Sequence, residues 1–397
     1  MKNILFVDDE KSILNSLRRL FIHEEYGVFL AENGNEALSI LASENIDLLI
    51  TDMKMPVMNG YELLKEVYKK YPKLIRIILS GFAEKEIIMK SIRENLAFFY
   101  LLKPWDNDHM INLINRLFYL KDILEQKNLL RFVEIYGDAF PSLYSNEKEL
   151  RLKLVDKAEI EEIIKIIERD PSTTLRVLYF VNSAYGIKTG SVKKALNYLN
   201  LNDLENILFR DWYDSLDDAI TQKNIGLIVN HSILTNKIVH YIYQELLCKN
   251  IDLQYDSVGL LCNIGGLILQ SAFTNEYTDL ITDAKEKKET IEKLEEKTFK
   301  MTSQEVGGYL LSWWGLPDPL IESASYLHKP LCDNIRNKEL VYILHLANYY
   351  SWKFFGLVPY ELNRKVFDLL GLKERNLEQM VHKIAITFIE EKQKRDL

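Results

Sequence analysis

The stretch that decides the fold runs from residue 47 to residue 60 and reads DLLITDMKMPVMNG. Its beginning is a short, mostly apolar run, which is typical of a strand buried on both faces of a parallel sheet. The run stops at Asp52, and a polar loop leads to Gly60, where apolar residues at helical spacing begin. A buried strand, a loop and a helix predict one unit of an alternating α/β fold.

The same unit recurs on both sides of this stretch. Apolar runs at 2–7, 26–31, 74–79 and 98–102 alternate with helical patterns at 12–24, 35–43, 61–70, 84–95 and from 106 onward. Five strands that alternate with five helices predict a doubly wound α/β domain with a parallel sheet.

Charged or hydroxyl-bearing side chains, which can bind a metal ion or a phosphoryl group, follow four of these five strands. They are Asp8 and Asp9, Asp52, Ser80 and Lys103. Because the carboxyl ends of parallel strands meet at one edge of the sheet, we expect these groups to converge. Clustered carboxylates repel one another unless a cation joins them, and Mg²⁺ suits all-oxygen ligands. An aspartate can attack a phosphoryl group, so the pattern predicts a Mg²⁺-dependent phosphoacceptor site.

Four short segments carry a resemblance to a known family: VDDE at 7–10, TDMKMPVMNG at 51–60, LSG at 79–81 and LLKPW at 101–105. They resemble the motifs of receiver domains in two-component response regulators, over residues 1 to 120. The resemblance implies a flavodoxin-like fold in which the parallel sheet has the strand order 2-1-3-4-5. The resemblance implies a phosphorylation site at Asp52 and a Mg²⁺ site made of Asp8, Asp9, Asp52 and the backbone of Lys54. It further implies that Ser80 and Tyr100 form a switch pair and that Lys103 contacts the phosphoryl group. It also implies a cis peptide bond before Pro104.

Two alternatives stay open for this domain. One is a degenerate receiver that is never phosphorylated, although no required residue is missing. The other concerns the Lys54 side chain, which either alters the rate of phosphoryl loss or is a solvent-exposed lysine without a kinetic role.

Residues 106–135 contain neither Gly nor Pro and repeat apolar residues near helical spacing. The last receiver helix is therefore predicted to continue into a helical linker at 121–139. The apolar stripe either packs on the chain's own domains or supports a homodimer, and both interpretations stay open.

The rest of the chain has helical periodicity without strand alternation, which predicts an all-α domain over 140–350 and a helical extension over 351–397. Segments such as ERDPSTTLRVLYFVNSAYG at 168–186, GLLCNIGGLIL at 259–269 and HLANYY at 345–350 resemble the HDOD domain, a divergent branch of the HD superfamily. The resemblance places the four metal-ligand positions of catalytic HD proteins on His231, Cys262, Asn263 and Asn348. Asparagine supplies no anionic carboxylate, and a lone Cys and His do not complete a metal site. We therefore expect a non-catalytic, protein-interaction output domain, with no catalytic residues and no enzyme activity.

Composition narrows the function further. The chain has 397 residues and a net charge of -8, and so lacks the basic footprint of nucleic-acid binding. Its three cysteines have no CxxC spacing, the amino terminus does not read as a signal peptide, and no run of about 20 apolar residues occurs, so a cytoplasmic protein without membrane contact is expected. The expected partners are a sensor histidine kinase and an unknown downstream protein. The alternative functions are a cyclic-dinucleotide phosphodiesterase of HD-GYP type, a nucleotide-sensing HD-like domain and a DNA-binding regulator.

Overall fold

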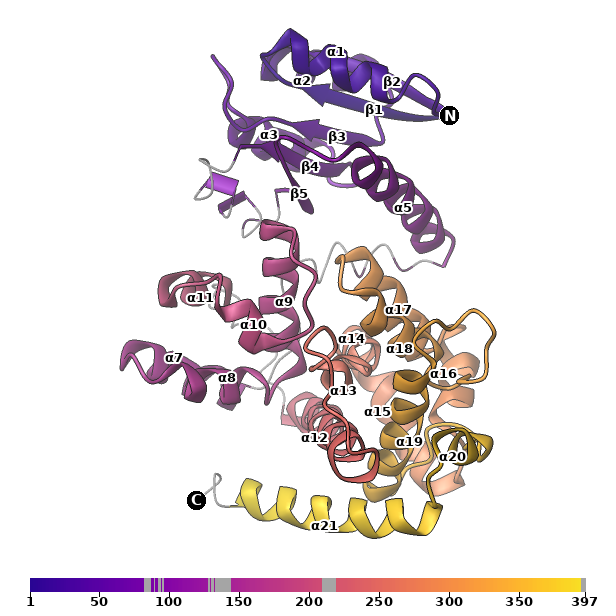
Figure 1. The fold of residues 1–397 in the computed structure, drawn as a ribbon. Helices are drawn as coiled ribbons and strands as arrows, with labels where there is room; N and C mark the ends of the chain where they lie inside the picture. The colour runs from indigo at the N-terminus through magenta and orange to yellow at the C-terminus, as the bar shows by residue number, and fades with distance from the viewer. Residues whose placement is uncertain are drawn as a thin grey trace. The chain divides into compact units, whose positions relative to one another are not determined.

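The computed structural model describes residues 1–81, 87–88, 90–91, 94, 96–127, 129, 132, 144–208 and 219–393 (Figure 1). The chain divides into two units. The first comprises Met1–Ile123 with Phe180–Ile187, and the second comprises Leu124–Tyr179 with Lys188–Leu397.

The first unit is built on a five-stranded parallel sheet in the order β2-β1-β3-β4-β5, as the sequence predicts. Its strands are β1 (Lys2–Val7), β2 (Tyr26–Ala31), β3 (Leu48–Thr51), β4 (Ile75–Ser80) and β5 (Phe99–Leu102). Every residue of β3 and β4 is buried, which explains why these strands read as continuous apolar runs rather than as alternating patterns.

The helices of this unit are α1 (Lys11–Leu20), α2 (Gly34–Ser43), α3 (Gly60–Lys70) and α5 (Asn107–Gln126). Asn59 fixes the start of α3, because its side chain accepts from the backbone of Glu62 while Glu62 accepts from the backbone of Asn59. Much of the helix predicted at 84–95 lies outside the described residues. Helix α5 ends at Gln126, and positions 128, 130–131 and 133–143, which include much of the linker predicted at 121–139, are also outside them.

The regular elements of the second unit are helices within its described residues, as predicted (Figure 1). Its first elements are α7 (Tyr144–Val155), α8 (Ile160–Ile167), α9 (Pro171–Tyr185), α10 (Val192–Leu196), α11 (Leu201–Leu208) and α12 (Ala219–Tyr241), followed by a π-helical turn, η2 (Ile242–Leu246). The remaining helices are α13 (Val258–Leu261), α14 (Ile264–Ala272), α15 (Thr274–Lys287), α16 (Ile291–Phe299), α17 (Ser303–Trp313), α18 (Asp318–Tyr326), α19 (Lys338–Phe354), α20 (Lys365–Leu370) and α21 (Glu374–Gln393).

Helix α12 lies at the centre of this unit, where α13, α14, α19 and α21 pack against it, and α17 packs against α14 and α18. The indoles of Trp313 and Trp314 are buried in this core. Within the described ranges, no single helix is long and apolar enough to cross a membrane. Two consecutive helical segments with a bend between them, Val258–Ala272 and Thr274–Lys287, together meet that criterion by length and composition only.

Candidate functional site

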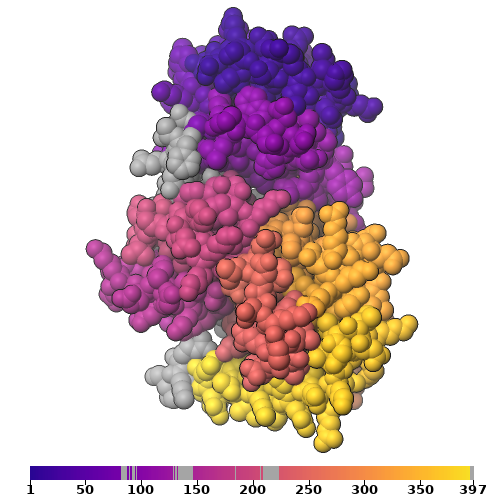
Figure 2. All heavy atoms as spheres, in the orientation of Figure 1, coloured from indigo at the N-terminus to yellow at the C-terminus, as the bar shows by residue number. Residues whose placement is uncertain are grey.

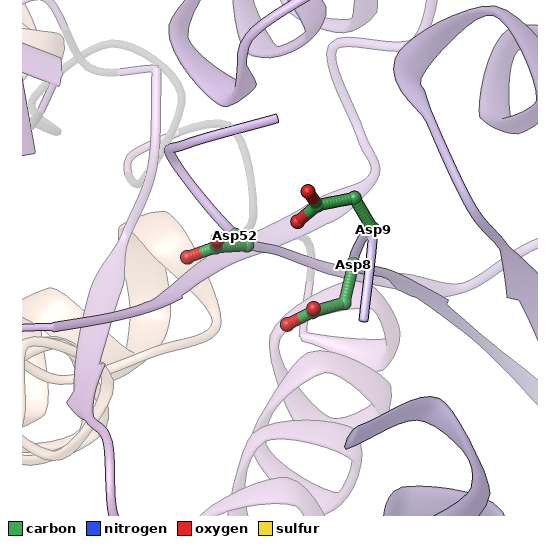
Figure 3. A group of neighbouring side chains, drawn as sticks. All are labelled: Asp8, Asp9 and Asp52. Carbon is green, nitrogen blue, oxygen red and sulfur yellow. The ribbon is translucent and has the colours of Figure 1, made fainter. Parts of the chain in front are cut away.

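Three carboxylates lie together at the carboxyl edge of the sheet (Figure 3). Asp8 and Asp9 follow β1, and Asp52 follows β3. These strands are neighbours, with Val7 paired to Thr51, so the next residues of the two strands leave the sheet side by side. One carboxylate oxygen from each aspartate lies within 4.8 Å of the others. Asp8 and Asp52 are buried and Asp9 is exposed, which leaves the group open to solvent on one side.

Lys103 supplies the positive charge of this site. Its ammonium lies 2.6 Å from a carboxylate oxygen of Asp8 and 3.4 Å from one of Asp52. Burial alone would lower the pKa of Lys103, but hydrogen bonds and attraction from the two aspartates outweigh it and raise the pKa. Burial raises the pKa of Asp8, while hydrogen bonds from Lys103 and the Glu10 backbone oppose the rise. Lys103 therefore stays charged and bridges the buried pair, and the peptide bond that follows it is cis.

A chain of hydrogen bonds connects Asp52 to β5. The Ser80 hydroxyl, at the end of β4, donates to Asp52 Oδ1 over 2.9 Å. The Tyr100 hydroxyl, on β5, donates to the backbone oxygen of Ser80 over 3.2 Å. The Ser80 hydroxyl therefore contacts the same Asp52 oxygen, Oδ1, that lies nearest to Lys103. The side chain of Lys54 is exposed at the same edge of the sheet.

Two backbone contacts at Asp52 were not expected from the sequence. The Thr51 hydroxyl donates to the backbone oxygen of Asp52 over 2.9 Å. An added Cβ on Gly60 would lie 2.1 Å from that same oxygen, so the first turn of α3 packs directly onto the strand end. Gly60, at the start of the helix, was the feature of the sequence that indicated this close packing. Together these contacts hold the backbone of Asp52 in place.

This donor set is chemically suited to a hard divalent cation. Carboxylate oxygens are the ligands that Mg²⁺ prefers, and Asp9 is exposed enough to share the cation with solvent and with a phosphoryl oxygen. Among the described residues, this is the one group of three or more acidic, His or Cys side chains with ligand atoms so close together.

A second cluster lies inside the helical unit, where the four degenerate positions come together. The amide nitrogen of Asn348, on α19, lies 3.2 Å from His231 Nε2, 2.9 Å from the Asn263 side-chain oxygen and 3.7 Å from Cys262 Sγ. His231 comes from α12, and Cys262 and Asn263 join α13 to α14. Residues 117 positions apart thus share one buried site.

Hydrogen bonds determine which ring nitrogen of His231 carries a hydrogen. Ser351 Oγ lies 2.8 Å from His231 Nδ1 and donates its own hydrogen to the His231 backbone oxygen. Nδ1 must therefore carry a hydrogen and donate to Ser351, which leaves Nε2 to accept from Asn348. Burial holds the pKa of His231 well below its usual value, and the ring stacks on Trp352 with centroids 3.8 Å apart. The imidazole is neutral, and its one lone pair, on Nε2, accepts the hydrogen bond from the Asn348 amide.

Burial raises the pKa of the neighbouring Cys262 thiol to about 12, which favours the thiol over the thiolate. Its Sγ donates to the backbone oxygen of Gly259 over 3.3 Å. Amide, thiol and imidazole groups thus meet through hydrogen bonds at these four positions.

Comparison with known proteins separates the chain into two matched segments. Residues 4–115 match the family model of the response regulator receiver domain, and residues 145–330 match that of the HDOD domain. The first segment falls in the sheet unit, and the second falls in the helical unit except for Phe180–Ile187.

Individual relatives match the sheet unit. The chain is 34% identical over 113 residues to the hydrogenase transcriptional regulatory protein HoxA of Cupriavidus necator; the match covers 28% of this chain and 23% of that protein. It is 35% identical over 120 residues to sporulation initiation phosphotransferase F of Bacillus subtilis, covering 30% of this chain and 96% of that one. A solved receiver domain of an HD domain-containing protein from Pseudomonas fluorescens is 32% identical, covering 30% of this chain and 97% of that one at a TM-score of 0.30. The chain thus spans about a quarter of the length of the first curated relatives that it matches.

Proposed function

Because the chain belongs to the response-regulator family, with a receiver domain followed by an HDOD domain, we propose that it is a phosphorylation-controlled switch. In this proposal a sensor histidine kinase phosphorylates Asp52, and the HDOD domain is a non-catalytic module that binds a downstream protein. The observation that carries it is the buried Asp8–Lys103–Asp52 bridge, with Ser80 donating to the same Asp52 oxygen that faces Lys103.

The proposed transfer uses the chain's own residues in defined roles. One Asp52 oxygen attacks the phosphorus of the kinase's phosphohistidine, and an O–P bond forms as the P–N bond breaks, with its electron pair left on the histidine nitrogen. Lys103 neutralises charge on the phosphoryl oxygens, and the Ser80 hydroxyl turns from Asp52 to donate to one of them. Asp8, Asp9, Asp52 and the backbone oxygen of Lys54 would hold Mg²⁺, which when bound offsets the repulsion between the carboxylates and the incoming phosphoryl group.

The switch would then act through Ser80 and Tyr100. When the Ser80 side chain moves toward the phosphoryl group, the backbone of Ser80 shifts with it. The position of the Tyr100 side chain then changes, because its hydroxyl donates to the Ser80 backbone oxygen. The added charge thereby alters the surface around β4 and β5.

The proposal that the HDOD domain does not hydrolyse phosphodiesters rests on the His231–Asn348 cluster. Metal-activated water requires a bound metal, but Asn348 and Asn263 are neutral amides and the His231 lone pair accepts a hydrogen bond from Asn348. Manganese-dependent or magnesium-dependent hydrolysis of cyclic di-GMP by the purified full-length protein would contradict this part of the proposal.

The test of the switch is phosphorylation by acetyl phosphate with MgCl₂, followed on phosphate-affinity gels. Wild type should shift, the shift should vanish in EDTA, and Asp52→Asn should not shift. Asp108→Asn is the matched control, since Asp108 is an exposed aspartate of the same unit that does not belong to the cluster of three carboxylates, and it should behave as wild type. An equal shift in Asp52→Asn, or no dependence on Mg²⁺, would refute the assignment.

A further inference from the structure

A cavity of about 820 Å³ opens in the helical unit, and none of the four residues of the His231 cluster is among its lining residues. The end of α8, one face of α12 with η2, and α21 form its walls. Helices α12 and α21 pack against each other, and their surfaces adjoin in the space-filling view, where the segment around η2 is coral and α21 is yellow (Figure 2). Part of its lining is apolar and comes from Ile233, Leu260 and Ile384.

Basic side chains dominate the charged part of the lining. Four cations face two carboxylates, namely Lys165, Arg169, Lys237 and Lys383 against Glu168 and Glu391. Outside the lining, Glu149 pairs with Arg169 and Asp256 adjoins Glu168, so Lys165 and Lys383 are the cations that are left to attract a ligand. Two ammonium groups on one opening favour an anionic ligand.

Two of these cations are held by partners and two are free to turn toward a ligand. Arg169 is bound by Glu149 at 3.0 and 3.1 Å, and Lys237 lies 2.5 Å from Glu391. Among the described residues, no carboxylate lies within ion-pair distance of Lys165 or Lys383. These two ammonium groups come from helices far apart in the sequence, α8 and α21, and both line the same opening.

The rim also offers groups that suit an organic ligand. Tyr241 is 41% exposed, and Gln244, in the π-helical turn η2, is exposed beside it. Such π-helical turns occur frequently at functional sites. Burial, and then the neighbouring Asp256, raise the pKa of Glu168 to about 7, so a protonated fraction of this carboxyl can donate a hydrogen bond at neutral pH.

We propose that this cavity binds a nucleotide, with Lys165 and Lys383 on its phosphates and its base against Tyr241 and the apolar lining. The volume lies in the range of sites for organic ligands and far exceeds what a lone phosphate ion fills. Base–aromatic stacking and lysine–phosphate pairing are the two interactions that this lining offers together. The inference goes beyond the proposed switch and does not depend on phosphorylation of Asp52.

The test is isothermal titration calorimetry of the full-length protein in EDTA, with ATP, GTP, cyclic di-GMP and sodium phosphate as separate probes. At least one nucleotide should bind at micromolar concentration, and phosphate should bind at least about tenfold more weakly. Lys165→Glu/Lys383→Glu should weaken nucleotide binding at least about tenfold, because two charge-assisted contacts are reversed. The matched control is Lys285→Glu/Lys297→Glu, which makes the same charge change at exposed lysines outside the cavity.

Three outcomes would overturn the inference: no binding of any nucleotide up to about 1 mM, phosphate binding as tight as nucleotide binding, or equal losses in the cavity and control variants. Tyr241→Ala provides a second variant if the charge reversal unfolds the protein. It removes an exposed ring, should leave thermal stability unchanged and should weaken nucleotide but not phosphate binding. Unchanged nucleotide affinity in Tyr241→Ala would contradict the assigned base position.

Discussion

Replacement of Gly265 by alanine tests how tightly the helical unit is packed around its core. Gly265 lies in the first turn of α14, where α17 crosses it. An added Cβ would lie 1.9 Å from the backbone oxygen of Ser303 and 2.6 Å from the backbone nitrogen of Gly307. Both atoms belong to the backbone of α17, so no side-chain rotation can relieve the clash.

The size of the effect follows from this geometry. Contacts of a real Cβ below 3.0 Å are essentially never seen, so α14 and α17 must separate by about 1 Å. Overpacking of this kind costs typically 1–3 kcal/mol, and alanine regains about 1 kcal/mol of helix propensity. Because the clash is with backbone, we expect the upper end of the range and a net loss of about 2 kcal/mol in the free energy of unfolding.

The neighbouring Gly266 provides a matched control. An added Cβ there meets nothing closer than the Tyr277 hydroxyl at 3.5 Å, which is ordinary van der Waals contact. Gly266→Ala should therefore stabilise the unit by about 0.5–1 kcal/mol through helix propensity alone. Urea unfolding followed by tryptophan fluorescence measures both variants, because Trp313, Trp314 and Trp352 are buried in this unit. Equal stabilities of the two variants would refute the packing argument.

Three further predictions concern single residues. Val57 is 87% exposed with φ of 71°, so Val57→Asn should raise the free energy of unfolding by about 1 kcal/mol; an unchanged denaturation midpoint would contradict this. Burial raises the pKa of Glu295 from 4.5 to about 7, so protonation of this carboxyl stabilises the fold. The free energy of unfolding should therefore fall by up to about 3 kcal/mol as the pH rises from about 4.5 to 7. Glu295→Gln should remove this slope from pH-dependent unfolding, and an equal slope in both proteins would disprove the assignment. Asn348→Asp puts a buried carboxylate beside His231 Nε2 and removes two amide donations, which should cost about 2–4 kcal/mol at pH 7.5 in urea unfolding, whereas unchanged stability would indicate a compensating ion pair with protonated His231.

Local pattern was sufficient for most elements of the receiver domain. The strand predicted at 47–51 is Leu48–Thr51 and the helix predicted at 61–70 is Gly60–Lys70, because period and capping act within a few residues of the chain. The strand predicted at 74–79 is Ile75–Ser80, so Ser80 lies in the strand and not after it. The helix predicted from residue 106 is Asn107–Gln126, and much of its predicted continuation to residue 139 lies outside the described residues.

The sequence by itself determined the α/β class and the convergence of Asp8, Asp52, Ser80 and Lys103. The physical reason is that parallel strands all present their carboxyl ends at one edge, so strand positions alone place these residues together. Residue identity alone also places neutral amides, those of Asn263 and Asn348, at two of the four positions in the helical domain.

Only the tertiary structure decided how the remaining groups meet. Asn348 contacts His231, and Lys165 and Lys383 line one cavity, because of the rotation and crossing of helices that are distant in the chain. Helical periodicity indicates which face of a helix is buried, but not which other helix covers it. The tautomer of His231 and the nucleotide-sized cavity therefore depend on packing between helices and could not be predicted from any local pattern.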